Sequence, residues 1–473
     1  MFVRNDKRET DSDFPFCFLV PDFISLILRR NLGILTPETI LASMIRQFDL
    51  RSSYSLPKDF LHDRTSSTDA VERAVRAILR RVQRDGDDAL RYYTKKFDGV
   101  TLSSLKVPEK DIRGALEHAD KKFVKVLKKA AANIRRFHLH QRHSSWKIRE
   151  EFSSDLRQLY LPIERVGVYV PGGRAAYPST VLMNVIPAQV AGVEEIHLVS
   201  PLNTNGKVNS DVLVAAGILN IKNIYCIGGA QAIAALAFGT KTIPSVDKIV
   251  GPGNIFVATA KRLVFGIVGI DSFAGPSEVV ILADDSARPE YIAADMLAQA
   301  EHDEHASSIL VTTSLLLANQ IRSELKKIVR VLPRQRIIET SLKQRGAIIL
   351  VRTLSQGADI VNAFAPEHLE IVTKNQEQTL KMIKHAGSIF LGNYSPVAIG
   401  DYFAGTNHVL PTEHTARFSS PLSVDDFVKK SSVTNYSKKK MESVSEDVAF
   451  FAEREGLTAH AFSLRLRGKN NNK

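Results

Sequence analysis

The segment VGVYVPGG, residues 166–173, joins a short valine-rich run to a glycine turn, and units of this kind recur along the chain. Between residues 162 and 391, such runs alternate with stretches in which apolar residues follow a helical spacing. The runs lack polar alternation, which is typical of strands buried on both faces of a parallel sheet. We expect strands at residues 166–170, 196–200, 224–227, 248–250, 279–283, 309–312, 347–351, 369–372 and 388–391, with helices between them, as at 180–191, 230–238, 289–301 and 315–329.

This alternation predicts an α/β protein, and the number of strands favours two parallel sheets over one. We therefore expect two Rossmann-like domains, at residues 161–275 and 276–410. A helical segment at 44–160 precedes them, and a small C-terminal segment at 411–473, polar and basic at first, follows them.

Residues 1–43 differ in character from the rest of the chain, and their apolar stretch at 14–28 is broken by Pro21. This stretch resembles neither a secretory signal nor an acid-poor transit peptide. We expect residues 1–43 to be an extension that is disordered or that precedes a natural start at Met44.

The composition is that of an ordinary globular chain, because 44% of the 473 residues are hydrophobic and 24% are charged. The two cysteines, Cys17 and Cys226, are too few for a disulfide scaffold or a thiolate zinc cluster, and they fit a reducing, cytoplasmic location. Cys226 is more typical of the end of a buried strand than of a nucleophile. No apolar run reaches the roughly 18 residues of a membrane span, so no membrane contact is expected.

The net charge of +12 is concentrated in one segment. Residues 101–150 hold 13 basic and 5 acidic side chains, a balance of 13 − 5 = +8. A helical pattern at 111–137 gathers five lysines on one face: Lys121, Lys122, Lys125, Lys128 and Lys129. We interpret this face as solvated, since no zinc-finger spacing, aromatic RNA-binding motif or helix-turn-helix accompanies it. We therefore expect no nucleic-acid partner.

Glycine-rich turns lie at residues 171–173, 228–231, 251–254 and 274–278. We interpret each as the end of a strand that leads into a helix, and together they indicate a ligand crevice at the carboxyl edge of a sheet. None completes the fingerprint G-x-G-x-x-G, because Phe256 stands where the third glycine belongs. The pattern alone is therefore a weak signal for a dinucleotide.

Four groups of polar residues are candidates for chemistry. Gln299 and His302 share a helical face, which is found both in metal sites and at ordinary polar helix ends. The remaining groups are Glu367 with His368 before a buried strand, Asp401 with His408 in a glycine-containing loop, and Glu455 with His460 near the C-terminus.

Together these stretches resemble one family, the histidinol dehydrogenases. The resemblance runs from about Met44 to about Arg467 and preserves the order and spacing of its motifs. They are VGVYVPGG, GGAQAIAALAFGT, VDKIVGPGN, AGPSEV, QAEH, PEHLE, GDYFAGTNHVLPT and EGLTAH.

The resemblance implies an NAD-dependent, zinc-containing oxidoreductase. Such an enzyme oxidises L-histidinol to L-histidinal and then to L-histidine, in two successive hydride transfers that end histidine biosynthesis. His368 would take the alcohol proton, and Glu367 would activate water on the bound aldehyde. The resemblance also implies an intertwined homodimer in which the C-terminal segment reaches the partner's active site.

Further roles follow from the same resemblance. One zinc ion per subunit would be held by Gln299, His302, Asp401 and His460. NAD would contact Tyr169, Gln231 and Asn254. The substrate would contact Ser277, Gln299, His302, His368, Asp401, His408, Glu455 and His460.

Two positions depart from the family pattern. Glu413 and His414 stand where the family commonly has two glycines, and the QAEH motif continues with Asp303, Glu304 and His305, where a proline is usual after His302. None of these residues is an implied ligand, but His305 could compete for metal.

Two alternatives stay open at this point. A paralogue could oxidise another amino alcohol on the same scaffold, although the complete zinc set and the Glu367–His368 pair argue against it. A nucleic-acid-binding protein could use the basic face at 121–129, with binding that vanishes in modest salt and ignores histidinol.

Overall fold

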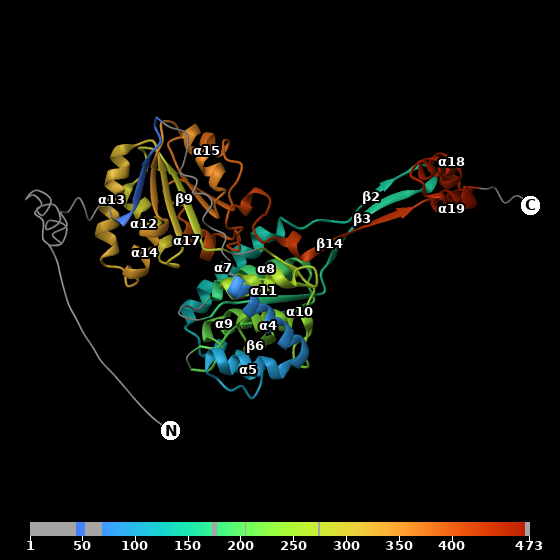
Figure 1. The fold of residues 1–473 in the computed structure, drawn as a ribbon, viewed down its shortest axis with the longest axis horizontal. Coiled ribbons are helices and arrows are strands. Elements are labelled where there is room, and N and C mark those ends of the chain that lie inside the picture. The colour runs from blue at the N-terminus through green and yellow to red at the C-terminus, as the bar shows by residue number, and fades with distance from the viewer. Residues whose placement is uncertain (1–43, 53–68, 173–176, 204, 273–274, 469–473) are drawn as a thin grey trace, which may run out of the picture.

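Two parallel sheets form the body of the molecule, as the alternation of runs predicts (Figure 1). The computed structural model describes residues 44–52, 69–172, 177–203, 205–272 and 275–468. The expectations for residues 1–43, including Cys17, fall outside the described residues. Every run predicted as a strand forms one, and all strand pairs within the two sheets are parallel. The α/β class with two sheets is confirmed.

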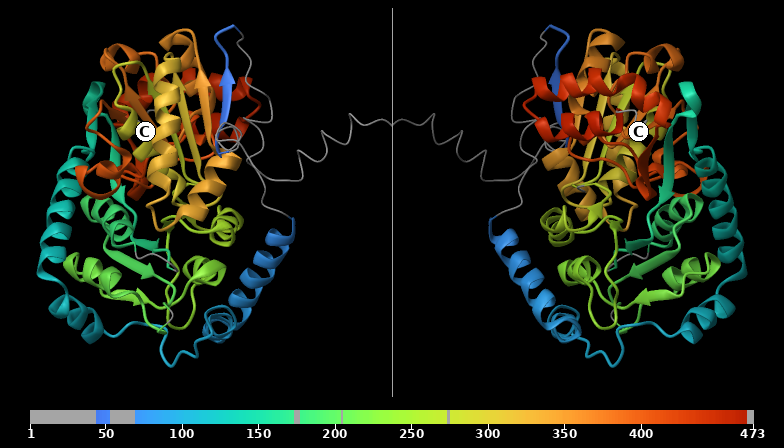
Figure 2. Two further views of the ribbon diagram at one scale, coloured as in Figure 1. Left: turned by 90° about the vertical axis from the view of Figure 1, so that its left-hand side faces the viewer. Right: turned by 90° about the vertical axis from the view of Figure 1, so that its right-hand side faces the viewer.

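The five-stranded sheet lies in the first half of the chain. Helices cover both of its faces because its strands are apolar on both sides (Figure 2). In spatial order its strands are β6 (Asn223–Tyr225), β5 (Glu195–Val199), β4 (Arg165–Tyr169), β7 (Lys248–Val250) and β8 (Gly269–Ile270). One face packs against α7 (Lys121–Leu139), α8 (Pro178–Ala191) and α9 (Ser210–Ile218), and the other against α4 (Asp69–Asp85), α5 (Asp87–Asp98), α10 (Gly229–Phe238) and α11 (Ile255–Val264).

The six-stranded sheet holds most of the candidate chemistry. Its order is β1 (Arg46–Asp49), β11 (Ala347–Leu350), β10 (Ser307–Thr312), β9 (Glu278–Ala283), β12 (His368–Val372) and β13 (Ser388–Leu391). One face packs against α12 (Pro289–Ala300), α13 (Leu315–Val329) and α14 (Gln335–Arg345), and the other against α15 (Leu354–Phe364) and α16 (Gln376–Leu380). Strand β1 comes from the segment expected to be helical, and it extends this sheet by pairing with β11.

The basic helix expected at 111–137 is two helices, which corrects the prediction. They are α6 (Glu109–His118) and α7, and Asp120 separates them. The Asp120 carboxylate accepts a hydrogen bond from the Phe123 amide at 2.8 Å and so caps α7. The periodic apolar pattern continued across this cap, so periodicity alone did not show the break.

A narrow arm projects from the body (Figure 1). Its antiparallel sheet has the order β14 (Val428–Asn435), β3 (Asp155–Pro162) and β2 (Trp146–Arg149), and β14 was missed from sequence because it is polar and largely exposed. The arm ends in α18 (Lys438–Arg454) and α19 (Thr458–Gly468), which pack on each other. Short helical turns complete the chain: η1 (Glu151–Ser153), α17 (Val397–Ile399), η2 (Gly400–Ala404), η3 (Thr415–Arg417) and η4 (Val424–Phe427). Among the described helices, none has the length and apolarity needed to cross a membrane.

Candidate active site

Glu367 and His368 stand at the amino end of β12, which lies between β9 and the edge strand β13 in the six-stranded sheet. Both are oriented by the backbone of Glu278, the first residue of the neighbouring strand β9. The Glu278 amide donates to Glu367 Oε2 at 2.8 Å, and His368 Nδ1 donates to the Glu278 carbonyl at 3.0 Å. The two side chains are only 7% and 4% exposed. Parallel pairing of β9 with β12 therefore fixes the orientation of a buried acid and a buried imidazole.

The remaining ring nitrogen of His368 faces Asp401. His368 Nε2 is buried, has no hydrogen-bond partner, and lies 3.7 Å from Asp401 Oδ1. Burial disfavours the imidazolium, but the Glu367 and Asp401 carboxylates outweigh burial and hold the pKa of His368 well above its ordinary value. Nε2 is thus the ring atom available to a ligand.

Asp401 and His408 lie together in the segment that follows β13. Asp401 belongs to the π-helical turn η2, a rare geometry that is frequent at functional sites. His408 Nδ1 donates to the Asp401 carbonyl at 3.0 Å, which leaves its Nε2 as the free ring nitrogen. Asn133 of α7 donates to the Phe403 carbonyl at 2.9 Å and ties this turn to the first sheet's helices.

Gln299 and His302 come from the end of α12. Gln299 is buried, and its Nε2 has no hydrogen-bond partner. Burial would raise the pKa of the Asp401 carboxyl, but His368, His408 and His302 together lower it. The exposed His302 ring therefore lies near Asp401. The His302 amide donates to the Gln299 carbonyl at 3.3 Å, so these two residues are neighbours. Ser277 is half-buried and immediately precedes Glu278 on β9.

These residues fit a zinc ion only in part within one chain. Nitrogen and oxygen donors from His302, Asp401 and the amide oxygen of Gln299 suit zinc. The unpartnered Gln299 Nε2 is a hydrogen-bond donor and does not itself point to a metal. Among the described residues, no group of three or more His, Cys, Asp or Glu side chains is placed to hold a metal ion. Glutamine is not one of those side chains; Gln299, His302 and Asp401 would be three donors, one fewer than the four of a tetrahedral zinc site.

The cysteine adds nothing to this site. Cys226 lies beyond β6, and its thiol donates to the Leu105 carbonyl at 3.1 Å. Burial raises the pKa of the Cys226 thiol to about 11, so the thiolate needed for metal binding or attack is suppressed.

The expected NAD contacts lie at the carboxyl edge of the five-stranded sheet. Tyr169 ends β4, and its buried hydroxyl accepts from the Gly229 amide at 3.1 Å. Burial raises the pKa of this phenol to about 12, so it stays neutral. Gln231 of α10 keeps a buried Oε1 without a partner, and Asn254 caps α11 by accepting from the Phe256 and Val257 amides at 3.1 and 3.2 Å.

The turn at Gly251 is closely packed at the carboxyl edge of the five-stranded sheet. Gly251 has a φ of +109°, and a Cβ there would lie 2.1 Å from the Tyr169 carbonyl oxygen. Its amide donates to Asp271 at 2.7 Å, and its carbonyl accepts from Lys261 at 3.0 Å. Lys261 and Asp271 form a buried ion pair with each other, so the turn is held on both sides.

One glycine turn was interpreted wrongly. The segment at Gly275 does not end a strand but connects β8, which ends at Ile270, to the start of β9. Only the other three turns lie at the carboxyl edge of the first sheet. Ser277 therefore belongs to the amino edge of the second sheet, beside Glu367 and His368.

Glu455 and His460 are not near the other site residues within this chain. Both are exposed and lie on the arm. Glu455 caps the end of α18, and His460 lies in the first turn of α19, after a short connecting turn. Figure 1 shows these helices at the far end of the arm.

The departure at Glu413 and His414 has a backbone explanation. Their φ values are +51° and +66°, the left-handed region in which glycine is favoured. His414 Nδ1 donates to the Phe364 carbonyl at 2.5 Å, and Arg417 donates to the Ala363 carbonyl at 2.7 Å. These side chains cap the end of α15, just before Glu367. His305, the other departure, is exposed.

Two features of the site region were missed from sequence. The role of Glu278 is carried by its backbone, which no side-chain motif reveals. Glu370, two residues after His368, is a buried acid on a strand, and its place within the apolar run LEIV was a usable signal.

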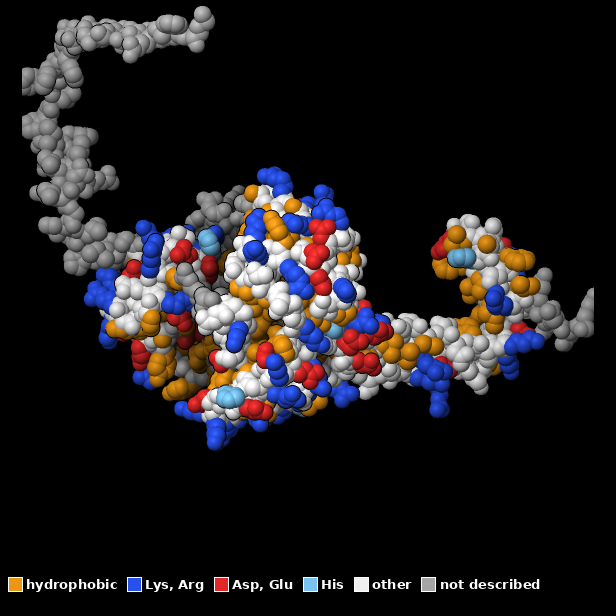
Figure 3. All heavy atoms as spheres, turned by 90° about the horizontal axis from the view of Figure 1, so that it is seen from below, with side chains coloured by type: hydrophobic (Ala, Val, Ile, Leu, Met, Phe, Trp, Pro, Cys, Tyr) orange, Lys and Arg blue, Asp and Glu red, His pale blue; other side chains and the backbone are white. Residues whose placement is uncertain are grey.

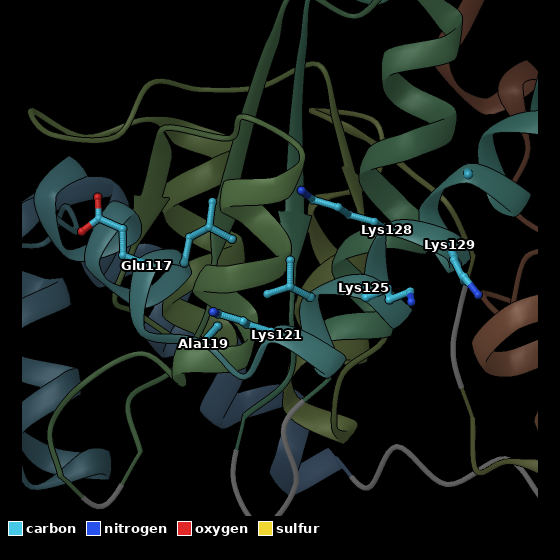
Figure 4. Close-up of a pocket in the computed structure, with 9 residues that line it drawn as sticks. Glu117, Ala119, Lys121, Lys125, Lys128 and Lys129 are labelled. Atoms are coloured by element: carbon cyan, nitrogen blue, oxygen red, sulfur yellow. The ribbon is translucent and has the colours of Figure 1, made fainter.

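A surface hollow elsewhere does not belong to this site. It lies against α6 and α7, has a volume of about 580 Å³, and includes Lys121, Lys125, Lys128 and Lys129 in its lining (Figure 4). It contains none of the predicted site residues. The five lysines of α7 are exposed, as a solvated face requires.

Comparisons with known proteins identify the family of this chain. A family model for histidinol dehydrogenase matches residues 61–468. The histidinol dehydrogenases of Geobacillus kaustophilus and Bacillus subtilis are each 52% identical over 402 residues, which cover 85% of this chain and 95% and 94% of those proteins. The crystal structure of histidinol dehydrogenase from Elizabethkingia anophelis is 36% identical, with a TM-score of 0.84 over 90% of this chain and 98% of that one. The chain belongs to the histidinol dehydrogenase family.

Proposed function

We propose that Glu367 and His368 carry the proton transfers by which this enzyme oxidises L-histidinol to L-histidine. Family membership gives the overall reaction, the oxidation of histidinol to histidine with NAD in histidine biosynthesis. The observation that supports the residue roles is the shared backbone anchor at Glu278, which orients both side chains. A buried, oriented acid and imidazole are what two consecutive proton transfers require.

In the first step, His368 accepts the hydroxyl proton of histidinol at Nε2. The carbon bearing that hydroxyl loses its hydrogen as hydride to NAD, which yields histidinal and NADH. Nδ1 cannot take this part because it donates to the Glu278 carbonyl. The neutral ring is the active form, so the proton that the two carboxylates favour on Nε2 must leave before the step begins.

In the second step, Glu367 takes a proton from water as the water oxygen adds to the aldehyde carbon of histidinal. The gem-diol that forms loses hydride to a second NAD and becomes the carboxyl group of histidine. Hydration is needed because the aldehyde hydrogen leaves as hydride only after the carbon has become tetrahedral.

Zinc would be held by Gln299, His302, Asp401 and the partner's His460. Its positive charge would anchor the imidazole and amine of the substrate and would offset the Asp401 carboxylate. Ser277, His408 and the partner's Glu455 would contact the substrate beside it. The NAD site would lie at the carboxyl edge of the five-stranded sheet, where it would be lined by Tyr169, Gln231 and Asn254.

The proposal includes a homodimer with shared active sites. Glu455 and His460 are exposed on an arm that leaves the body, while the body would supply three of the four donors of a tetrahedral zinc site. Apolar side chains gather on the same arm (Figure 3). Phe450, Phe451 and Phe462 are 64%, 64% and 68% exposed, which is costly for large aromatic side chains in water. A second copy of the chain would cover them and receive the two polar residues.

The test of the activity is NADH formation from L-histidinol by the full chain. Two NADH per histidinol, with histidine as the product, is the expected stoichiometry. Faster turnover of another amino alcohol would support the paralogue alternative instead. The cytoplasmic location expected from the cysteine content remains a prediction.

A further inference from the structure

Asn407 lies in the same segment as Asp401 and His408, and no role has been assigned to it above. It is a polar residue, yet it is only 5% exposed. Its side-chain oxygen Oδ1 accepts from the Val409 amide at 2.9 Å, so the side chain spans the residue between the two. That residue is His408. The side chain of Asn407 therefore fixes the backbone from which His408 projects.

The nitrogen of the same side chain faces two helices of the five-stranded sheet. Asn407 Nδ2 donates to the Met183 carbonyl of α8 at 2.7 Å and lies 3.3 Å from His138 Nε2 of α7. An amide oxygen only accepts and an amide nitrogen only donates, so a single orientation of Asn407 satisfies both Val409 and Met183. One side chain thus ties the segment of Asp401 and His408 to the helices of the other sheet.

The Met183 carbonyl is available to Asn407 because of a proline. In a regular helix this carbonyl would accept from the amide four residues later, at position 187. Residue 187 is a proline inside α8, and a proline has no amide hydrogen to donate. A buried carbonyl without a donor is costly, and Asn407 supplies the donor that Pro187 lacks. The gap in the hydrogen bonding of α8 is therefore an attachment point for the active-site segment.

His138 is held in the form that accepts from Asn407. Its ring is buried, and its Nδ1 lies 2.7 Å from Gln141 Oε1. That oxygen only accepts, and it also accepts from the Val424 amide at 3.2 Å, so the ring hydrogen is on Nδ1 and Nε2 is an acceptor. Burial lowers the pKa of His138, against the opposing effect of Gln141, and so favours the neutral ring. The acceptor for Asn407 is thus built into the core.

A second contact attaches the earlier part of the segment. Next to the Asn133–Phe403 hydrogen bond, Gly405 approaches α7 so closely that a Cβ would lie 2.7 Å from the Asn133 carbonyl oxygen. Gly405 also has a φ of +116°, which favours glycine. The segment is therefore attached to the helices of the first sheet at two points, although Asp401 lies beside His368 of the second sheet.

We propose that Asn407 is a positioning residue, which anchors His408 and Asp401 to α8 through the carbonyl that Pro187 frees. Asn407 itself touches no reacting atom and acts through His408. The inference rests on the roles proposed above for His408 and Asp401.

A double-mutant cycle of Asn407→Ala and Pro187→Ala separates positioning from stability. Asn407→Ala leaves the Met183 carbonyl without a donor, so the unfolding temperature should fall by a few degrees. With zinc added, kcat/KM for histidinol should fall on the order of 10²-fold, mainly through KM, because His408 is displaced. The KM for NAD should change by less than about twofold. A loss of folded protein alone would lower kcat and leave the KM for histidinol unchanged.

Pro187→Ala restores an amide hydrogen at position 187, so α8 can satisfy the Met183 carbonyl by itself. Alone it is the matched control, and kcat/KM should stay within about twofold of the wild type. In this background, Asn407→Ala should cost fewer degrees of unfolding temperature, whereas its effect on kcat/KM should persist.

Asn407→Ser is a milder second variant, for the case that Asn407→Ala does not fold. The serine hydroxyl can still accept from the Val409 amide but is too short to reach the Met183 carbonyl. It should raise the KM for histidinol and leave the KM for NAD unchanged, in the same pattern as Asn407→Ala.

Three results would overturn the inference. Wild-type kcat/KM in the folded Asn407 variants would show that this residue positions nothing. Recovery of kcat/KM together with the unfolding temperature in the double variant would show a purely structural role. An equal fall of unfolding temperature in both backgrounds would show that Pro187 does not free the carbonyl for Asn407. A failure of the proposed function is seen separately, as full activity of His408→Ala, so the two failures are distinguishable.

Discussion

The body and the arm of this chain expose their candidate site residues in opposite ways. In the body, Glu367 and His368 are buried and fixed by hydrogen bonds to one strand residue. On the arm, Glu455 and His460 are exposed and far from that place (Figure 1). Preorganised groups serve the chemistry, because their geometry is set before the substrate arrives. Exposed groups on a projecting arm serve an assembly, because they acquire partners only when another surface meets them.

The largest expected effect is the loss of activity when the metal is removed, because the proposed zinc site takes ligands from both the body and the arm. The proposed donors contain no sulfur, and the body would supply three of the four proposed ligands. Treatment with a chelator should abolish NADH formation, and added zinc should restore it. Metal analysis of the dialysed protein is the accompanying measurement. Full turnover in a preparation without metal would contradict the proposed zinc site.

The next effect separates the two steps within the body. Glu367→Gln removes the base for hydration but leaves His368 in place, so oxidation of histidinal should fall by roughly 10²–10⁴-fold. Oxidation of histidinol to the aldehyde should fall much less. Single-turnover measurements from each substrate give the two rates. Equal losses would mean that the two roles are assigned wrongly.

A glycine pair tests the difference in packing between the regions. Gly251→Ala places a Cβ 2.1 Å from the Tyr169 carbonyl oxygen, so the turn must shift. We expect the KM for NAD to rise about tenfold, or ~1.4 kcal/mol of binding, with the KM for histidinol nearly unchanged. Gly456→Ala, on the arm, also has a positive φ but nothing within 4 Å of the new atom. It should cost only about 1 kcal/mol of stability and leave the KM for NAD alone.

The smallest effect is expected at the buried thiol. Cys226→Ala removes a group whose pKa is raised to about 11 and which donates only to backbone carbonyls. Both oxidation steps should keep their rates, and the free energy of unfolding should change by about 1 kcal/mol. Selective loss of the aldehyde step would instead indicate a covalent thiol intermediate.

The sequence predicted the two regions unequally, for a physical reason. The sheet strands of the body are continuous apolar runs because helices cover both faces, and each predicted run forms a strand. Strand β14 of the arm is exposed along most of its length, so nothing selects an apolar pattern there. The start of α7 was missed because a cap at Asp120 interrupts the chain without interrupting the periodicity.

The residues of the candidate site were also predicted unequally. The polar motifs identified the candidate residues through resemblance to a family, and the structure brings His302, Glu367, His368, Asp401 and His408 together. The backbone anchor at Glu278 depends on which strands become neighbours. Such contacts between distant segments have no local signature in the chain.

The central claim is that the arm of one subunit completes the active site of the other, and mixed dimers test it most directly. One chain carries His460→Ala and the other Asp401→Ala, each nearly inactive alone. If His460 acts across the interface, both lesions fall in one site of a mixed dimer and the other site is intact. Random reassortment should then recover about a quarter of wild-type activity, since half of the dimers are mixed and each has one intact site. No recovery, with mixed dimers verified by mass, would contradict the shared site.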